Sequence, residues 1–221
     1  MEQRTIDWFR ARLGKITGSA VADIMVKGRA KDQVFGATAM TYIYNVAGER
    51  MLNEDIVNDD ELFWEYIELV NTSSKAMRWG VENEGDARDL YAKKTGNSVT
   101  ETGSVEHSEV QRFAASPDGI VCDGEGCIEI KCVSNANFVR YGAITDAETL
   151  KATESKYYWQ TQAEMACTGA QWCDFIVYNP FMAQPLHIAR IDRNEEDINT
   201  MLERVKLADE LAQQLCDKLK N

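Results

Sequence analysis

The sequence has no run of about 18 consecutive apolar residues, so neither a membrane-spanning helix nor a membrane partner is expected. Its first residues, MEQRTIDWFRARLG, lack the apolar core of a secretory signal, and we expect a cytoplasmic protein. Proline is rare, with three residues, and no Pro/Ser-rich linker or internal repeat interrupts the chain. Since 221 residues are enough to bury one core, we expect a single domain over residues 1–221.

Histidine is also scarce, and the cysteines lack the spacing of metal ligands. His107 and His187 stand far apart in the sequence, and none of the six cysteines forms a C-x-x-C pair. Structural zinc sites usually combine closely spaced pairs of cysteine or histidine. We therefore expect ordinary reduced thiols, most of them buried, and no zinc centre.

Positive charge is in short supply, because 24 Lys and Arg face 36 Asp and Glu, giving a net charge of −12. Taken alone, this balance argues against a nucleic-acid partner. The argument is weak for an enzyme, since local basic contacts suffice and bound metal ions add positive charge that faces the phosphates. Composition therefore leaves nucleic acid open as a substrate.

Helical and strand-like patterns follow one another along the chain and indicate an α/β domain. Ser19 is predicted to cap the second helix, Ser73 or Ser74 to cap the fourth, and Gly96 to end that fourth helix. The acidic stretch 53–61 predicts a solvated loop. Helices are predicted over residues 5–14, 19–26, 36–53, 73–96, 135–144, 154–169 and 194–220, and strands over 111–116, 119–121, 127–133, 172–179 and 186–192.

The stretch SPDGIVCDGEGCIEIKC, residues 116–132, concentrates acidic side chains around one lysine. Asp118 lies in a P-D-G turn, and a strand would place Glu129 and Lys131 on one face, about 6–7 Å apart. A hairpin through CDGEGC would bring Asp118 beside Glu129, and the Ile130 carbonyl would lie between Glu129 and Lys131. Such oxygens suit Mg²⁺ or Mn²⁺, whereas a cationic lysine would orient a water molecule or stabilise developing charge.

The spacing D-x₁₀-E-x-K leaves two interpretations open. Charged side chains on an exposed strand face are common, so the segment is compatible with a solvated hairpin. The alternative is a metal site for phosphodiester hydrolysis, which needs a polarised phosphate, a nucleophilic water and a stabilised leaving oxygen.

At these residues the sequence resembles the PD-(D/E)XK nuclease superfamily, and within it the phage lambda exonuclease-type alkaline exonucleases, also described as YqaJ-like viral recombinases. Four blocks match in order: WFRARLGKITGS, RWGVENEGDAR, SPDGIVCDGEGCIEIKC and YYWQTQAEM. The resemblance implies a restriction-endonuclease-like core, in which helices flank a central mixed β-sheet. It also implies that residues 1–221 form one nuclease domain.

The resemblance assigns roles to individual residues of the catalytic site. Asp118 and Glu129 match the metal-binding carboxylates, with the Ile130 backbone carbonyl beside them, and Lys131 matches the catalytic lysine. Glu84 matches a helix-borne acid that reaches the metal directly or through water. An exposed Glu84 paired with Arg88 is the alternative from the residues alone.

Gln160 matches a glutamine that faces the reacting strand. The alternative is a polar position on a half-buried helix, where Gln160 and Glu164 share a face. Some relatives in the wider superfamily carry Q-x-x-x-Y, and this chain has Glu164 in place of the tyrosine.

A second group of residues matches the part of the family that holds the DNA end. Arg12, Ser19 and Ser116 match groups that bind the 5′-phosphate of the digested strand, in keeping with the fork geometry of guanidinium. For Arg12 a surface arginine and for Ser19 a plain helix cap are the alternatives. A local basic patch either contacts duplex DNA through charge or is an ordinary loop, and its residues are Lys27, Arg29 and Lys31.

The activity implied by the resemblance is Mg²⁺-dependent 5′-to-3′ digestion of one strand of linear duplex DNA from a 5′-phosphorylated end. The 3′ single strand left behind would serve a single-strand annealing protein in phage or prophage recombination in a bacterial host cell. A homotrimer ring around the DNA is also implied, although the apolar face of the last helix favours packing within its own subunit. The alternatives are a restriction- or Cas4-like nuclease of the same superfamily and a non-catalytic module that binds DNA ends. Most aromatic residues are expected to pack in the core.

Overall fold

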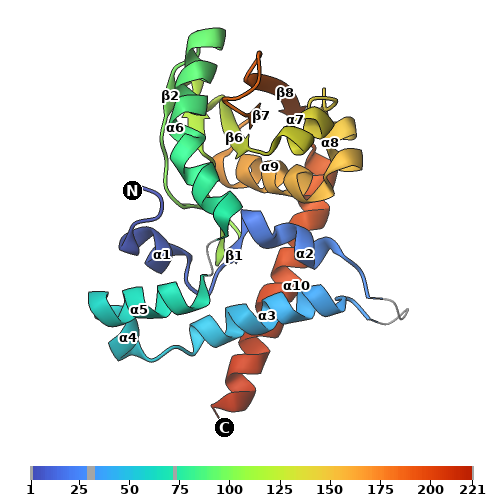
Figure 1. Cartoon of the computed structure of the whole chain (residues 1–221). Helices are drawn as coiled ribbons and strands as arrows, with labels where there is room; N and C mark the ends of the chain where they lie inside the picture. Colours follow the sequence, from blue (N-terminus) through green and yellow to red (C-terminus); the bar gives the residue numbers. More distant parts are fainter. Residues whose placement is uncertain (1, 29–32, 72–73, 221) are drawn as a thin grey trace.

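A mixed five-stranded β-sheet lies in the upper part of the molecule in Figure 1. In the computed structural model, which describes residues 2–28, 33–71 and 74–220, the strand order is β2-β5-β6-β7-β8. β6 and β7 pair in parallel, and the other neighbours pair antiparallel. The predicted α/β class with a mixed central sheet is therefore confirmed. The strands are β2 (Val99–Thr100), β5 (Gly119–Val121), β6 (Gly126–Cys132), β7 (Trp172–Tyr178) and β8 (Leu186–Asp192).

Helices cover both sides of this sheet. α6 (Lys75–Thr95) packs on one face and α9 (Ser155–Thr168) on the other, while α10 (Glu195–Leu219) runs diagonally through the lower part of Figure 1. Within the described ranges, no helix combines the length and the apolar composition that crossing a bilayer requires. The remaining helices are α1 (Ile6–Arg12), α2 (Val21–Met25), α3 (Ala37–Arg50), α4 (Glu54–Asn58), α5 (Asp60–Val70), α7 (Asn135–Tyr141) and α8 (Ala147–Thr153), with 3₁₀ turns η1 (Gly18–Ala20) and η2 (Cys122–Gly124).

The two faces of β6 carry different kinds of side chain, because successive residues of a strand point to opposite sides. Ile128 and Ile130 are buried in an apolar cluster with Tyr91 of α6. Cys127 lies on the opposite face, in the core that includes α9. Glu129 follows Cys127 by two residues and so points to the α9 side as well.

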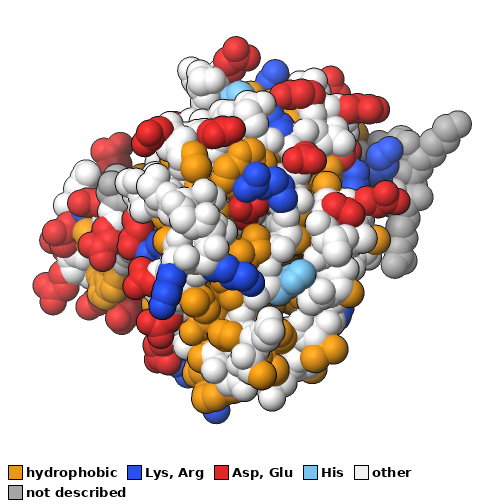
Figure 2. Space-filling model, turned by 90° about the horizontal axis from the view of Figure 1, so that it is seen from above, with side chains coloured by type: hydrophobic (Ala, Val, Ile, Leu, Met, Phe, Trp, Pro, Cys, Tyr) orange, Lys and Arg blue, Asp and Glu red, His pale blue; other side chains and the backbone are white. Residues whose placement is uncertain are grey.

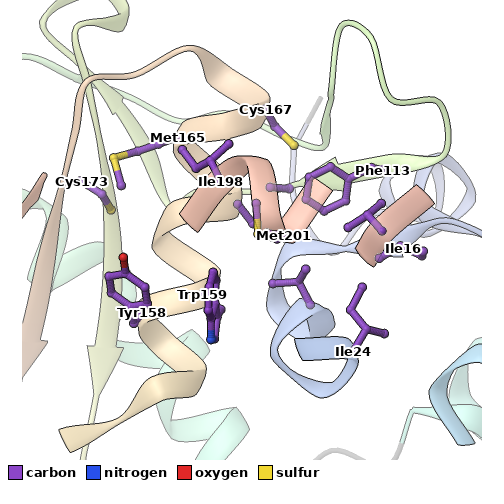
Figure 3. Close-up of a cluster of buried hydrophobic side chains, with 14 of the residues drawn as sticks. Ile16, Ile24, Phe113, Tyr158, Trp159, Met165, Cys167, Cys173, Ile198 and Met201 are labelled. Carbon is purple, nitrogen blue, oxygen red and sulfur yellow. The ribbon is translucent and has the colours of Figure 1, made fainter. Parts of the chain in front are cut away.

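The main hydrophobic core lies on that α9 side. Figure 3 shows Phe113 next to Ile16 of β1 and Met201 of α10, with Ile24 of α2 farther down and the residues of α9 to the left. The apolar face of α10 packs within its own subunit, as predicted. Its buried residues are Ile198, Met201, Val205, Ala208, Ala212 and Cys216, while Leu202, Leu211 and Leu215 are partly buried against the same core.

A second, smaller sheet with the order β1-β4-β3 joins the N-terminal segment to the middle of the chain. β1 (Ile16–Thr17) pairs in parallel with β4 (Phe113–Ala115), and β3 (Val105–Glu106) pairs with β4 antiparallel. Only β4 of these three strands was predicted. The β1–β4 pairing brings the end of α1 close to the P-D-G turn, and this contact matters for the site.

The prediction of a loop over residues 53–61 is wrong, because this stretch contains α4 and the start of α5. The Asn53 side chain caps α4 by accepting from the Asp55 backbone N–H, and Asp59 caps α5 by accepting from Glu61 and Leu62. Acidic residues are favourable in the first turn of a helix, where they face unpaired N–H groups and the positive end of the helix dipole. The acids that indicated a solvated loop thus belong to two helix starts.

The prediction that Ser19 caps the second helix is also wrong. Ser19 lies inside η1, and the position that precedes α2 is Ala20, which offers no side-chain cap. The predicted ends of α6 are confirmed: the Ser74 hydroxyl accepts from the Met77 N–H, and Gly96 adopts the left-handed conformation at φ 78°. The alternative cap, Ser73, lies outside the described residues.

Candidate active site

The predicted hairpin between β5 and β6 forms and brings Asp118 to Glu129. Gly119 pairs with Ile128, and the Asp118 N–H donates to the Ile128 carbonyl at 3.0 Å. Gly119 is needed here, since a Cβ atom at this position would lie 2.5 Å from a methyl carbon of Val99. The close pairing fixes the backbone on which the two carboxylates stand.

Asp118 is almost completely buried, and its carboxylate is held in one orientation. Its Oδ2 accepts a hydrogen bond of 2.7 Å from the Ile130 N–H. Burial raises the pKa of Asp118 well above its usual range, and the charges of Glu129 and Glu84 add to this effect. The cluster therefore resists a full set of negative charges unless a cation compensates them.

Glu129 is 2% exposed, and its two carboxylate oxygens have different surroundings. Its Oε1 accepts from Gln160 Nε2 at 2.7 Å and forms an ion pair with Lys131. Its Oε2 is buried and has no hydrogen-bond partner among the residues that the structure describes. A buried carboxylate oxygen without a partner is unfavourable, and it marks a position where a ligand would compensate it.

Lys131 is held by three groups around its ammonium. It pairs with Glu129, lies 3.4 Å from Gln160 Oε1, and stands 4.6 Å from the ring centroid of Tyr157. Burial opposes the charge of Lys131, but the carboxylates of Glu129 and Asp118 outweigh burial and raise its pKa. The two carboxylates therefore favour the cationic form of Lys131.

Gln160 and Glu164 lie one turn apart on α9 and face β6. Gln160 Nε2 donates to Glu164 Oε1 at 3.0 Å, and Cys173 Sγ lies 3.8 Å from Glu164 Oε2. Burial raises the pKa of Glu164, and the neighbouring charge of Glu129 raises it further. Potential ligand atoms of Cys127, Glu164 and Cys173 lie within 4.8 Å of one another, a grouping that sequence spacing does not reveal. It forms because Cys127 and Cys173 are register partners on β6 and β7.

Glu84 reaches the same region from α6, on the opposite side of the sheet. Its Oε1 accepts from Arg88 Nη2 at 2.9 Å, and its Oε2 pairs with Arg4. Arg88 also donates to the Asp118 carbonyl at 3.2 Å. Glu84 thus pairs with Arg88 but is buried rather than exposed, and it lines the same cavity as Asp118 and Glu129. No sequence signal pointed to Arg4.

One cavity of about 470 Å³ is lined by both groups of predicted residues. The catalytic candidates that line it are Asp118, Glu129, Ile130, Lys131, Glu84 and Gln160, and the candidates for the DNA end are Arg12, Ser19 and Ser116. Lys27 is exposed and does not line this cavity, and Arg29 and Lys31 lie outside the described residues. The fold thus brings Arg12 and Lys131, which are far apart in the sequence, to the same cavity.

Arg12 and Ser116 touch each other on the wall of this cavity. Arg12 Nη1 donates to Ser116 Oγ at 3.0 Å, and Trp8 Nε1 donates to the same oxygen at 3.1 Å. The Arg12 guanidinium lies over the Trp8 ring, 4.2 Å from its centroid, and this contact helps to hold it in place. A larger cavity, of about 660 Å³, lies between α1, α3 and α5, and Trp8 and Arg12 line it as well. Trp8 therefore contacts both Arg12 and Ser116, which sequence reasoning did not predict.

The outer surface and the cavity both carry acidic and basic side chains. On the face shown in Figure 2, acidic side chains gather on the left and along the top, and a few basic side chains lie among apolar ones in the centre. The cavity receives Arg4, Arg12 and Lys131 from separate elements, beside the acids Glu84, Asp118, Glu129 and Glu164. Arg4 pairs with Glu84 and Lys131 pairs with Glu129, so Arg12 is the cation of the cavity for which the structure shows no ion pair within the described residues.

The chain is similar to known proteins in both sequence and fold. Residues 7–171 match the family described as the YqaJ-like viral recombinase domain. The crystal structure of an alkaline exonuclease (LHK-Exo) from Laribacter hongkongensis has a TM-score of 0.77 at 32% sequence identity, and the match covers 98% of this chain and 96% of that one. Its complex with dAMP gives a TM-score of 0.78 at 33% identity with the same coverage.

A phage-related exonuclease from Haemophilus somnus 129PT shares the fold, with a TM-score of 0.68 and 18% identity over 93% of this chain and 96% of that one. No curated protein matches the sequence. The fold is thus that of the alkaline exonucleases, and the predicted restriction-endonuclease-like core is confirmed.

Proposed function

The chain belongs to the family of YqaJ-like viral recombinase domains, and on that premise we propose that it is a Mg²⁺-dependent exonuclease for linear double-stranded DNA. The observation that carries the proposal is the single cavity in which Asp118, Glu129 and Lys131 face the Arg12–Ser116 pair. A carboxylate cluster and a phosphate clamp on one cavity fit an enzyme that cuts a phosphodiester near a strand end. Its similarity to an alkaline exonuclease over nearly the whole chain supports the same reaction class.

The residues present fit a divalent cation. Asp118 and Glu129 offer hard carboxylate oxygens, and the buried Glu129 Oε2 has no partner within the described part of the chain. We propose that these two residues hold Mg²⁺, which Mn²⁺ can replace, with help from the Ile130 carbonyl and from Glu84 directly or through water. When bound, the ion would polarise the phosphate and lower the pKa of a water molecule.

Lys131 and Gln160 complete the proposed catalytic set. Because the carboxylate of Glu129 favours the cationic form of Lys131, we assign Lys131 to stabilising negative charge on the phosphate and to orienting the attacking water. Gln160 presents its amide between Glu129 and Lys131, where it would face the reacting strand. Neither side chain requires movement to reach the cavity that both residues line.

The clamp would set the polarity of digestion. Arg12 offers a guanidinium that lies against the Trp8 ring, and Ser116 and Ser19 add hydroxyl groups on the same cavity. We assign these groups to a terminal 5′-phosphate, which favours charged, forked donors. Digestion would then run 5′ to 3′ and leave a 3′ single strand for an annealing protein in phage-type recombination.

The remaining parts of the proposal concern assembly and location. We propose that residues 1–221 act as one nuclease domain and assemble as a homotrimer ring in the cytoplasm of a bacterial host, encoded by a phage or prophage. A ring would keep an acidic protein on DNA by enclosure, since the net charge of −12 opposes long-range attraction. Lys27, Arg29 and Lys31 would contact the duplex backbone through charge.

The test uses linear duplexes that carry either a 5′-phosphate or a 5′-hydroxyl, incubated with Mg²⁺ or with EDTA. The proposal expects metal-dependent release of nucleotides from phosphorylated ends and leaves a 3′ tail. Cutting of closed circles would identify a restriction- or Cas4-like endonuclease instead. Binding of ends without cleavage would identify a non-catalytic module.

A further inference from the structure

The buried acid Glu164 has no role in the proposed reaction so far, yet it touches the residues that do. We propose that Glu164 is a positioning residue that fixes the orientation of the Gln160 amide against Glu129 and Lys131. The inference rests on the proposed function, because it assumes that Gln160 acts in cleavage. The carrying observation is that Glu164, 1% exposed, accepts one of the two N–H groups of Gln160.

The hydrogen bonds of Gln160 are satisfied in only one of its two amide orientations. Its NH₂ group donates to Glu129 Oε1 at 2.7 Å and to Glu164 Oε1 at 3.0 Å, which uses both N–H groups. Its oxygen then faces the Lys131 ammonium at 3.4 Å. A flipped amide would place its oxygen against the Glu129 carboxylate and its NH₂ group against the Lys131 ammonium. These two charged groups favour the observed orientation, and Glu164 Oε1 supplies the acceptor that the second N–H needs in that orientation.

Removing Glu164 would weaken this selection without removing any predicted catalytic group. Glu129 would still accept one N–H of Gln160, but the other N–H would lose its acceptor in a buried environment. The Gln160 amide could then rotate more easily, and its oxygen would no longer be held against Lys131. Such a change affects the arrangement of the reacting groups more than the binding of DNA.

Packing alone does not explain an acid at this position. The surroundings of Glu164 are core side chains, including Cys127 and Cys173, and thiols are weak hydrogen-bond partners. An apolar side chain would fill such a place at lower desolvation cost. A structural zinc site needs four ligands, whereas this cluster offers three. The polar neighbours of the Glu164 side chain are Gln160, Glu129 and Cys173, and Gln160 is the one that donates a strong hydrogen bond to it.

The experiment compares steady-state digestion of a 5′-phosphorylated duplex by the full-length wild type, Glu164→Met and Glu164→Gln. Methionine resembles glutamate in length but accepts no strong hydrogen bond, whereas glutamine keeps an acceptor oxygen. We expect Glu164→Met to lower kcat about tenfold or more while KM stays within about twofold. Glu164→Gln should recover most of kcat. Glu164→Leu repeats the test should methionine not be accommodated.

A double-mutant cycle with Gln160→Met decides whether Glu164 acts through Gln160. We expect Glu164→Met to have no further effect on kcat in the Gln160→Met background. The same loss of kcat in both backgrounds would overturn the proposal, and so would an active wild type whose kcat is unchanged by Gln160→Met. A wild type without any exonuclease activity would instead refute the proposed function, so the two failures are distinguishable.

Discussion

On one face of β6, Ile128 and Ile130 pack with α6 in an apolar cluster, while on the other face Glu129 and Lys131 lie against Gln160 and Tyr157 of α9. Burying an isoleucine stabilises a fold by about 1.5–3 kcal/mol. Leaving a buried oxygen such as Glu129 Oε2 without a partner costs about 1–3 kcal/mol. The apolar face of this strand thus stabilises the fold, whereas the polar face contains a buried oxygen that lowers stability and presents Glu129 and Lys131 to the cavity.

The largest expected effect comes from Lys131 on the polar face. Lys131→Met should lower the rate of cleavage about 10²–10³-fold, because it removes the cation that stabilises charge in the transition state. Binding of Mn²⁺ should remain, since lysine is not a ligand. The measurement pairs single-turnover digestion with a calorimetric Mn²⁺ titration, and Asp118→Asn is the matched control. A loss of Mn²⁺ affinity as large as in Asp118→Asn would contradict the role given to Lys131.

A smaller effect is expected at the proposed 5′-phosphate clamp, which consists of Arg12, Ser19 and Ser116. The pairing of β1 with β4 brings this clamp close to the polar face of β6. Arg12→Ala should reduce the preference for 5′-phosphorylated over 5′-hydroxyl ends about tenfold or more, since a charge-assisted hydrogen bond is worth about 1.5–3 kcal/mol. Initial rates on the two duplexes measure this ratio. Lys15→Ala is the control, because Lys15 lines the neighbouring cavity and pairs with Glu106. An unchanged ratio in Arg12→Ala would remove Arg12 from the clamp.

The smallest effect is expected from the apolar face. Ile128→Val should lower the free energy of unfolding by about 0.5–1.5 kcal/mol, because it deletes one buried methylene group from a fully buried side chain. Urea unfolding measures the loss. Its kcat should equal that of the wild type, although Ile128 is the chain neighbour of Glu129. A change in kcat without a change in stability would contradict the claim that the apolar face contributes to stability and not to catalysis.

The polar face could be predicted because its signals are local. The alternation in CIEIKCV places Glu129 and Lys131 on one side of a strand, and the Asp-Gly-rich turn predicts the hairpin that returns to Asp118. Family resemblance then selected a metal site over a solvated hairpin. The buried position of Glu129 is consistent with that choice.

The other contacts depend on pairings that leave little trace in a sequence. β1 has only two residues, Ile16 and Thr17, and yet its pairing with β4 brings Arg12 to Ser116. The contact of Glu164 with Gln160 was visible as a four-residue spacing, but its direction toward Cys173 follows from how α9 lies on β6 and β7. Short strands and the placement of a helix on a sheet are tertiary outcomes, which local patterns do not encode.

The central claim is that the polar face of β6 is built around a divalent cation, and thermal unfolding with and without Mg²⁺ tests it most directly. At a Mg²⁺ concentration 100 times the Kd, binding should stabilise the wild type by about 2.7 kcal/mol, which raises its Tm. Without metal, Asp118→Asn should be at least as stable as the wild type, because it removes a buried charge beside Glu129 and Glu84. The account predicts that Mg²⁺ raises the Tm of the wild type and leaves that of Asp118→Asn unchanged. An equal rise in both proteins, or no rise in a wild type that digests DNA, would contradict it.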